Sequence, residues 1–172
     1  MDKSMRRNRL IEDNAIYHVT ARANRHEMIL FCPAMRLLFI KILKRARQKY
    51  KFQILNFCIM GNHIHLILKP EKGESLSRIM QWILSVFARA WNKNHYVQGH
   101  VWGDRFYSKI INSFQAFIRT FDYITQNPVN ARLVNNAWQW KESGLWHWIS
   151  HRKELLGEPP PLIQILFHNY FN

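Results

Sequence analysis

The sequence has few cysteines and no long apolar runs, and each shortage argues against a class of protein. Its two cysteines, Cys32 and Cys58, form no CxxC pair. A disulfide framework is therefore not indicated, which fits a reducing cytoplasm. No apolar run reaches membrane-spanning length, and the basic start, MDKSMRRNRL, lacks the apolar centre of a signal peptide. We therefore expect a cytoplasmic protein that does not enter a membrane.

Acidic residues are also scarce. Against 25 Lys and Arg there are only 11 Asp and Glu, which gives a formal net charge of +14. The acids are scattered rather than clustered, which disfavours a nuclease that holds two metal ions with carboxylates. The excess of positive charge predicts an anionic partner, most simply nucleic acid. A DNA-bound protein of this kind would be associated with the nucleoid.

The remaining composition favours a single domain, because 172 residues of which 48% are hydrophobic can bury a substantial core. Periodicity and turn signals predict strands at 15–21, 52–60, 63–68 and 105–111. Helices are predicted at 33–50, from Ser75 to about residue 91, and after Ser113. This order is the βαββαβ plan of a ferredoxin-like α+β protein, an antiparallel sheet with helices on one face.

The chain is expected to divide into three parts. Residues 1–13 form a basic N-terminal arm, and residues 14–135 form the ferredoxin-like domain. Residues 136–172, which are rich in Trp and contain a proline run, form a C-terminal helical extension and tail.

The strongest chemical signal is His63-Ile64-His65, at the start of the third predicted strand. Strand side chains alternate between faces, so His63 and His65 point the same way, roughly 6.6 Å apart along the chain. Ile64, Leu66 and Leu68 take the opposite face and can bury it. Two imidazoles on one rigid face can bind a single divalent metal ion.

A second cluster lies at the end of the last predicted helix. Arg119, Tyr123 and Asn127 are spaced by four and share one helix face. Pro128 disfavours helix at Asn127, so Tyr123 and Asn127 are expected in the last turn. The buried face of this helix is expected to comprise Phe114, Phe117, Ile118, Phe121 and Ile124. A helix end docked across the sheet could bring the amide oxygen of Asn127 to the metal as a third ligand, with Tyr123 one turn away.

Such a site could cut and rejoin nucleic acid. Two imidazoles and one amide oxygen leave coordination positions for phosphate oxygens and water. Tyr123 could then attack the phosphorus atom and form a phosphotyrosine. Because that link is covalent, a free hydroxyl group can reverse the step, which favours strand transfer over hydrolysis.

Three alternatives remain open. Tyr107, on a strand beside Arg105 and Lys109, is a rival nucleophile. The histidines could belong to a structural zinc site with Cys58 or His18 in an RNA-binding domain. The chain could also be a non-catalytic hairpin-binding protein.

Four motifs occur in a specific order, and as a set they point to a known family. They are Tyr17-His18-Val19-Thr20 followed by Arg22, Asn24 and Arg25; Met60 with Asn62-His63-Ile64-His65-Leu66; Trp102-Gly103-Asp104-Arg105-Phe106; and Tyr123-Ile124 with Asn127-Pro128-Val129 and Ala131. Over roughly residues 9–150, the sequence resembles single-tyrosine HUH transposases of the insertion-sequence type, most of all the REP-associated tyrosine transposases. It departs from them at Gly61, where relatives often have Pro, and at Ala23, where they often have Gly.

The resemblance implies a ferredoxin-like fold, Mg²⁺ or Mn²⁺ as cofactor, and cleavage of single-stranded DNA beside an imperfect hairpin of a palindromic repeat. His63 and His65 would be metal ligands, Asn127 a third ligand and Tyr123 the nucleophile. A monomer is expected, although relatives of the insertion-sequence type form dimers. Contacts with DNA are expected from Arg6, Arg7, Arg9, Arg22, Asn24, Arg25, Trp102, Arg105, Lys109 and Arg119.

Overall fold

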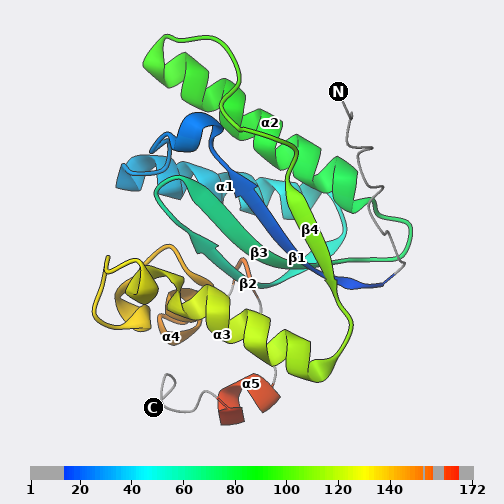
Figure 1. The fold of residues 1–172 in the computed structure, drawn as a ribbon. Helices are drawn as coiled ribbons and strands as arrows, with labels where there is room; N and C mark the ends of the chain where they lie inside the picture. The colour runs from blue at the N-terminus through cyan, green and yellow to red at the C-terminus, as the bar shows by residue number, and fades with distance from the viewer. Residues whose placement is uncertain (1–13, 153, 157–160, 167–172) are drawn as a thin grey trace, which may run out of the picture.

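Four strands form one antiparallel sheet in the order β2-β3-β1-β4 (Figure 1). The strands are β1 (Ile16–Arg22), β2 (Phe52–Ile59), β3 (His63–Pro70) and β4 (Tyr107–Ile111). The computed structural model describes residues 14–152, 154–156 and 161–166. All four predicted strands are present, although β4 begins at Tyr107 rather than at Arg105.

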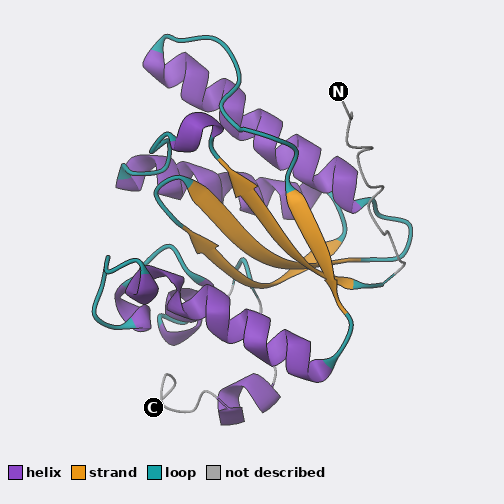
Figure 2. Cartoon of the chain, in the orientation of Figure 1, coloured by secondary structure: helices purple, strands orange, loops and turns teal. Residues whose placement is uncertain are grey.

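Helices cover both faces of this sheet (Figure 2). On one face lie α1 (Pro33–Lys49) and α2 (Leu76–His95), and on the other lies α3 (Phe114–Asn130). Shorter helices are η1 (Asn24–His26), η2 (Ala137–Gln139), α4 (Gly144–Ile149) and α5 (Pro161–Leu166). The ferredoxin-like α+β class is confirmed. The two helices of the βαββαβ plan, α1 and α2, lie on one face as expected, and α3, which follows β4, lies across the second face.

Both helices with predicted serine caps begin as expected. The Ser75 hydroxyl accepts a hydrogen bond from the Arg78 amide at 3.3 Å, and that of Ser113 accepts one from Ala116 at 3.1 Å. These bonds satisfy amide groups that have no partner within the helix.

The predicted end of α3 is wrong, because the helix continues through Pro128 to Asn130. A helical proline removes one backbone hydrogen bond, but the Ala131 amide, three residues further on, still donates to the Asn127 carbonyl at 3.0 Å. Pro128 is also buried, so packing supports the helix there. Phe114, predicted to be buried, is 53% exposed at the first turn of α3.

Strand β3 is buried on both faces. Ile64, Leu66 and Leu68 lie in the core beneath α1 and α2, and all three are 0% exposed, as the alternation predicted. On the other face, Ile67 packs in a second core with Phe121 of α3. The histidines of β3 therefore lie on the face that α3 covers.

Asn56, a buried polar residue of β2, fixes α3 to this sheet. Its amide group donates to the Phe121 carbonyl at 3.3 Å and to the Thr125 hydroxyl at 3.2 Å. Its side-chain oxygen accepts the Phe57 amide at 2.8 Å. Because burying an unpaired amide is costly, these three bonds favour one position of α3 on its own sheet.

The chain beyond α3 covers the free edge of β2. The Ile59 amide donates to the Glu142 carbonyl at 3.0 Å, and the Trp140 indole donates to the Ile59 carbonyl at 3.0 Å. Cys58 also forms a β-bridge with Ser143. These contacts satisfy edge groups that would otherwise be open to pairing with another chain.

Two predictions about the chain ends are not tested. The basic arm, with Arg6, Arg7 and Arg9, lies outside the described residues. The divisions after residues 13 and 135 remain predictions. In the part of the chain that is described, none of the helices combines the length and the apolar character needed to cross a bilayer.

His147 of α4 predicts a pH-dependent stability. Its side chain is 3% exposed and packs edge-on against Phe57, with ring centroids 5.2 Å apart. Burial, then the charges of Lys44 and Arg152, lower its pKa from 6.5 to about 4. The unfolded chain binds this proton from pH 6.5 downwards, but the folded chain binds it only near pH 4. The free energy of unfolding should therefore fall as the pH drops through this window.

His147→Gln removes this titration, so the variant should lose less unfolding free energy than the wild type between pH 7 and pH 4. Urea unfolding at several pH values measures the difference. Carboxylates and the other histidines titrate in both proteins and cancel in the comparison. Parallel pH profiles would contradict the assignment.

Candidate active site

The site lies between β3 and α3. His63 and His65 project from β3 with ring centroids 5.0 Å apart. Tyr123 of α3 stands edge-on to His65, at a centroid distance of 5.5 Å and an interplanar angle of 87°. The Tyr123 side chain is 50% exposed, whereas His65 is only 5% exposed. Both imidazoles and the tyrosine, predicted from segments about sixty residues apart, therefore meet within one chain.

Strand β1 supplies two further members of the site. Thr20 lies opposite His65 in the strand register. His18 Nε2 lies 3.0 Å from His65 Nδ1, and Thr20 Oγ1 lies 3.2 Å from the same nitrogen. From the sequence, His18 was a possible zinc ligand, and both His18 and Thr20 belonged to a family motif without an assigned role in the site. His18 and Thr20 are two residues apart, so they share one face of β1. The strand register that brings both to His65 is a feature of the tertiary structure.

Both histidines of β3 are neutral at pH 7. Burial, followed by the charges of His63, His18 and Arg22, lowers the pKa of His65 to about 3. Burial, then the charge of Arg22, lowers the pKa of His63 to about 4. A neutral imidazole keeps a lone pair for a metal ion.

The donor set fits an ion with an incomplete protein shell. No group of three or more His, Cys, Asp or Glu suited to a metal occurs among the described residues. Two imidazoles would therefore need oxygen donors, such as an amide, phosphate or water, to complete the shell of a metal ion. Burial, then the charge of Glu142, raises the pKa of the Cys58 thiol, which argues against a zinc thiolate there.

Asn127 lies one helical turn beyond Tyr123. Its side-chain nitrogen donates to the Tyr123 carbonyl at 3.2 Å, within the same helix. In the described part of the chain, no hydrogen bond joins Asn127 to either histidine of β3. Its role as a third ligand stays a prediction.

The rival nucleophile, Tyr107, lies on the same sheet face. It is opposite Thr20 in the β1–β4 register, and its side chain is 63% exposed. Among the described residues, Tyr123 has ring contacts with His65 and His18, whereas Tyr107 has none with a site histidine. The geometry therefore favours Tyr123.

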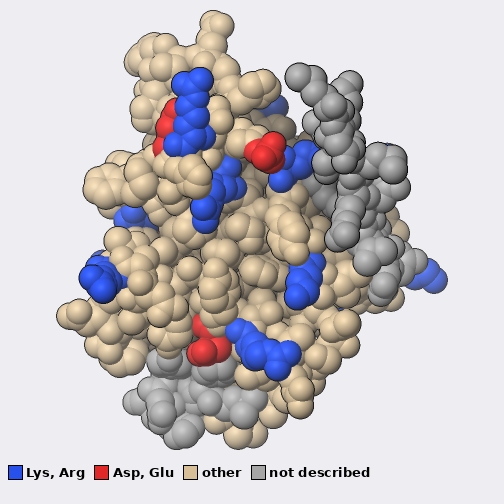
Figure 3. Space-filling model, viewed as in Figure 1, with Lys and Arg blue, Asp and Glu red and all other residues tan. Residues whose placement is uncertain are grey.

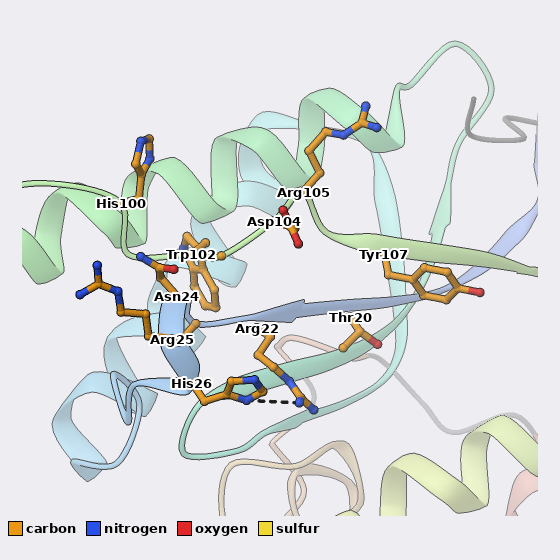
Figure 4. Close-up of a pocket in the computed structure, with 12 residues that line it drawn as sticks. Thr20, Arg22, Asn24, Arg25, His26, His100, Trp102, Asp104, Arg105 and Tyr107 are labelled. Carbon is orange, nitrogen blue, oxygen red and sulfur yellow. Dashed lines mark hydrogen bonds between the residues drawn. The ribbon is translucent and has the colours of Figure 1, made fainter. Parts of the chain in front are cut away.

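Beside the histidines, a cavity of about 500 Å³ opens at the end of β1 (Figure 4). Five of the residues predicted to contact DNA line it, namely Arg22, Asn24, Arg25, Trp102 and Arg105. Thr20 and Tyr107 also line it, so the cavity adjoins the histidine site. The face of the molecule drawn in Figure 3 carries more Lys and Arg than Asp and Glu.

The loop that forms this cavity has an unusual backbone. Arg25 and His26 have φ values of 50° and 58°, in the left-handed region. Ala23, where relatives often have glycine, is extended, with φ −60°. The left-handed turn therefore follows Ala23, and alanine at this position causes no strain.

The predicted DNA contacts differ in exposure. Arg22, Arg25 and Arg105 are exposed, and Arg105 points away from Arg22 (Figure 4). Trp102 is only 9% exposed, and its indole donates to the Leu84 carbonyl at 3.0 Å, which favours a packing role.

The other two predicted contacts lie on β4 and α3. Lys109 is exposed opposite His18, and Arg119 is exposed on α3. All these DNA contacts stay predictions.

The chain thus combines a ferredoxin-like sheet, a His-x-His pair on β3 and a tyrosine on the helix that lies across it. The family described as "Transposase IS200 like" matches residues 12–127, and the chain belongs to this family.

Individual proteins are also similar to this chain. A protein from Haemophilus influenzae, described as a REP-associated tyrosine transposase, is 27% identical over 115 residues, which is 61% of this chain and 65% of that protein. The structure of a REP-associated tyrosine transposase bound to a REP hairpin superimposes with a TM-score of 0.74 and 19% identity, over 86% of this chain and 87% of the other.

A second structure, of a protein from Deinococcus radiodurans described as a transposase, matches with a TM-score of 0.50 and 14% identity. That match covers 70% of this chain and 95% of the other. At these identities, the two structural matches establish the fold.

Proposed function

We propose that this chain is a metal-dependent endonuclease and strand transferase for single-stranded DNA, acting beside imperfect hairpins of palindromic repeats. The observation that carries the proposal is the edge-on position of the Tyr123 ring, 5.5 Å from that of His65, next to a cavity with three arginines. Membership of the transposase family supports the reaction class. The similar structure bound to a REP hairpin supports the choice of DNA.

In the proposed reaction, Tyr123 Oη forms a bond to phosphorus, and the bond from phosphorus to the leaving sugar oxygen breaks. The phenolic proton passes to solvent, and the leaving oxygen takes up a proton. His63 and His65, with Asn127 as a candidate third ligand, would hold Mg²⁺ or Mn²⁺. When bound, that ion would polarise the scissile phosphate and offset its developing charge. A free hydroxyl group reverses the step and rejoins the strand.

The arrangement favours a monomer as the active unit. Tyr123 reaches His65 of its own chain because α3 is fixed to β2 through Asn56. A second copy is thus not needed to complete the site. The exposed arginines around the cavity would hold the single strand by its phosphates, close to the histidines. We place this activity in the cytoplasm, on nucleoid DNA.

The test uses wild-type protein and a hairpin oligonucleotide with a single-stranded flank, in which the fragment released by cleavage is short enough to diffuse away. With Mg²⁺ or Mn²⁺, a covalent adduct should survive denaturing electrophoresis, and mass spectrometry should map the modification to Tyr123. EDTA and a fully paired duplex are the controls. Tight hairpin binding without an adduct in either metal would instead identify a non-catalytic hairpin-binding protein.

Arg25→Gln should weaken DNA binding in a salt-dependent manner. Loss of one phosphate contact should flatten the log–log dependence of the binding constant on salt by about 0.7 to 0.9. Lys72→Gln is the matched control. Lys72 is exposed and follows the end of β3 that is opposite to His63. Fluorescence anisotropy in EDTA measures both slopes without cleavage. Equal slopes for the two variants would show that Arg25 makes no contact with a DNA phosphate.

A further inference from the structure

Both histidines of β3 use the same ring nitrogen to contact a neighbour. His63 Nδ1 lies 2.7 Å from Asn62 Oδ1. His65 Nδ1 lies 3.0 Å from His18 Nε2 and 3.2 Å from Thr20 Oγ1. With Nδ1 occupied in each ring, Nε2 is the nitrogen left for a metal ion.

At His63 the hydrogen-bond network determines the tautomer. The Asn62 side-chain nitrogen donates to the His26 carbonyl at 3.3 Å, which orients the amide so that its oxygen faces His63. An amide oxygen can only accept a hydrogen bond. His63 Nδ1 must therefore carry the proton, and the Nε2 lone pair is free.

At His65 the contact allows two arrangements. His65 Nδ1–H can donate to His18 Nε2, or His18 Nε2–H can donate to His65 Nδ1. The first leaves a lone pair on His65 Nε2, and the second places a proton there. Only the first allows His65 to bind a metal.

The two rings also lie against each other. The His18 ring stacks on that of His65, with centroids 5.3 Å apart and planes at 24°. A neutral imidazole accepts a hydrogen bond at one of its two nitrogens, so His18 Nε2 can serve as the acceptor.

We propose that His18, assisted by Thr20, is a positioning residue that holds His65 as the Nδ1–H tautomer, with its Nε2 lone pair directed to the metal. Asn62 does the same for His63. Partners of this kind commonly change metal affinity by about 10- to 100-fold when removed. The proposal rests on the metal site proposed above, but the tautomer of His65 can be measured without metal.

The test compares three variants. His18→Phe keeps an aromatic ring to stack on His65 and removes the acceptor. His18→Gln places an amide oxygen near the original Nε2 and restores an acceptor. His95→Phe is the control, because His95 is exposed at the end of α2 and stacks on Trp91, away from the site. Thermal unfolding verifies that each variant is folded.

Two measurements decide the proposal. Calorimetric titration with Mn²⁺ should show affinity about 10- to 100-fold lower in His18→Phe, largely restored in His18→Gln and unchanged in His95→Phe. In the metal-free protein, imidazole ¹⁵N shifts should report Nδ1–H at His65 in the wild type and a shift away from that tautomer in His18→Phe.

Each outcome separates the two proposals. An unchanged His65 tautomer and unchanged Mn²⁺ affinity in His18→Phe would overturn the role of His18. If the wild type bound no Mn²⁺ but the tautomer still depended on His18, the metal site would fail while the positioning role would stand.

Discussion

Replacing Tyr123 by Phe should abolish the covalent DNA adduct while leaving hairpin binding nearly intact. Only the nucleophilic oxygen is lost, and the ring can keep its edge-on contact with His65. Adduct formation should fall below detection, since loss of the nucleophile costs a covalent catalyst about 10⁶-fold in rate. Denaturing electrophoresis measures the adduct, and a mobility shift in EDTA measures hairpin binding.

Tyr107→Phe is the matched control, because Tyr107 is an exposed tyrosine on the same sheet face. This variant should still form the adduct. The opposite pattern, with adduct retained in Tyr123→Phe and lost in Tyr107→Phe, would assign the nucleophile to β4. Loss in both would indicate that Tyr107 positions the DNA.

The second large effect concerns the metal. His63→Ala and His65→Ala should each lose metal-dependent cleavage, because each removes one of two imidazole ligands. We expect Mn²⁺ affinity to fall by about 100-fold or more, since a direct ligand matters at least as much as its hydrogen-bond partner. Cleavage across a Mg²⁺ titration and calorimetry with Mn²⁺ measure the two effects. His63 is the cleaner test, because it is half-buried whereas His65 is 5% exposed.

Asn127→Ala should do less damage. Water can replace a neutral amide oxygen, and the amide nitrogen of Asn127 already bonds within its own helix. His95→Ala is a control for the general loss of an imidazole. Full cleavage in Mg²⁺ by both His63→Ala and His65→Ala would exclude this metal site.

Local patterns predicted most elements because each depends on neighbouring residues. Ser75 and Ser113 mark helix starts through hydrogen bonds that span three residues. The alternation of apolar residues along β3 assigned Ile64 to the core beneath α1 and α2 and His63 to the opposite face. The end of α3 was predicted too early at Pro128, because tertiary packing can offset the loss of one helical hydrogen bond.

By itself, the sequence determined the elements, their order, the paired histidines on one strand face and, through its motifs, the family. The tertiary structure decided that α3 lies on the second face of the sheet, where Asn56 fixes it by bonds to residues about 65 positions away. It also decided the register that places His18 and Thr20 against His65, 47 and 45 residues along the chain. Strand periodicity gives the face of a side chain but not its cross-strand partner, which depends on how the sheet as a whole packs.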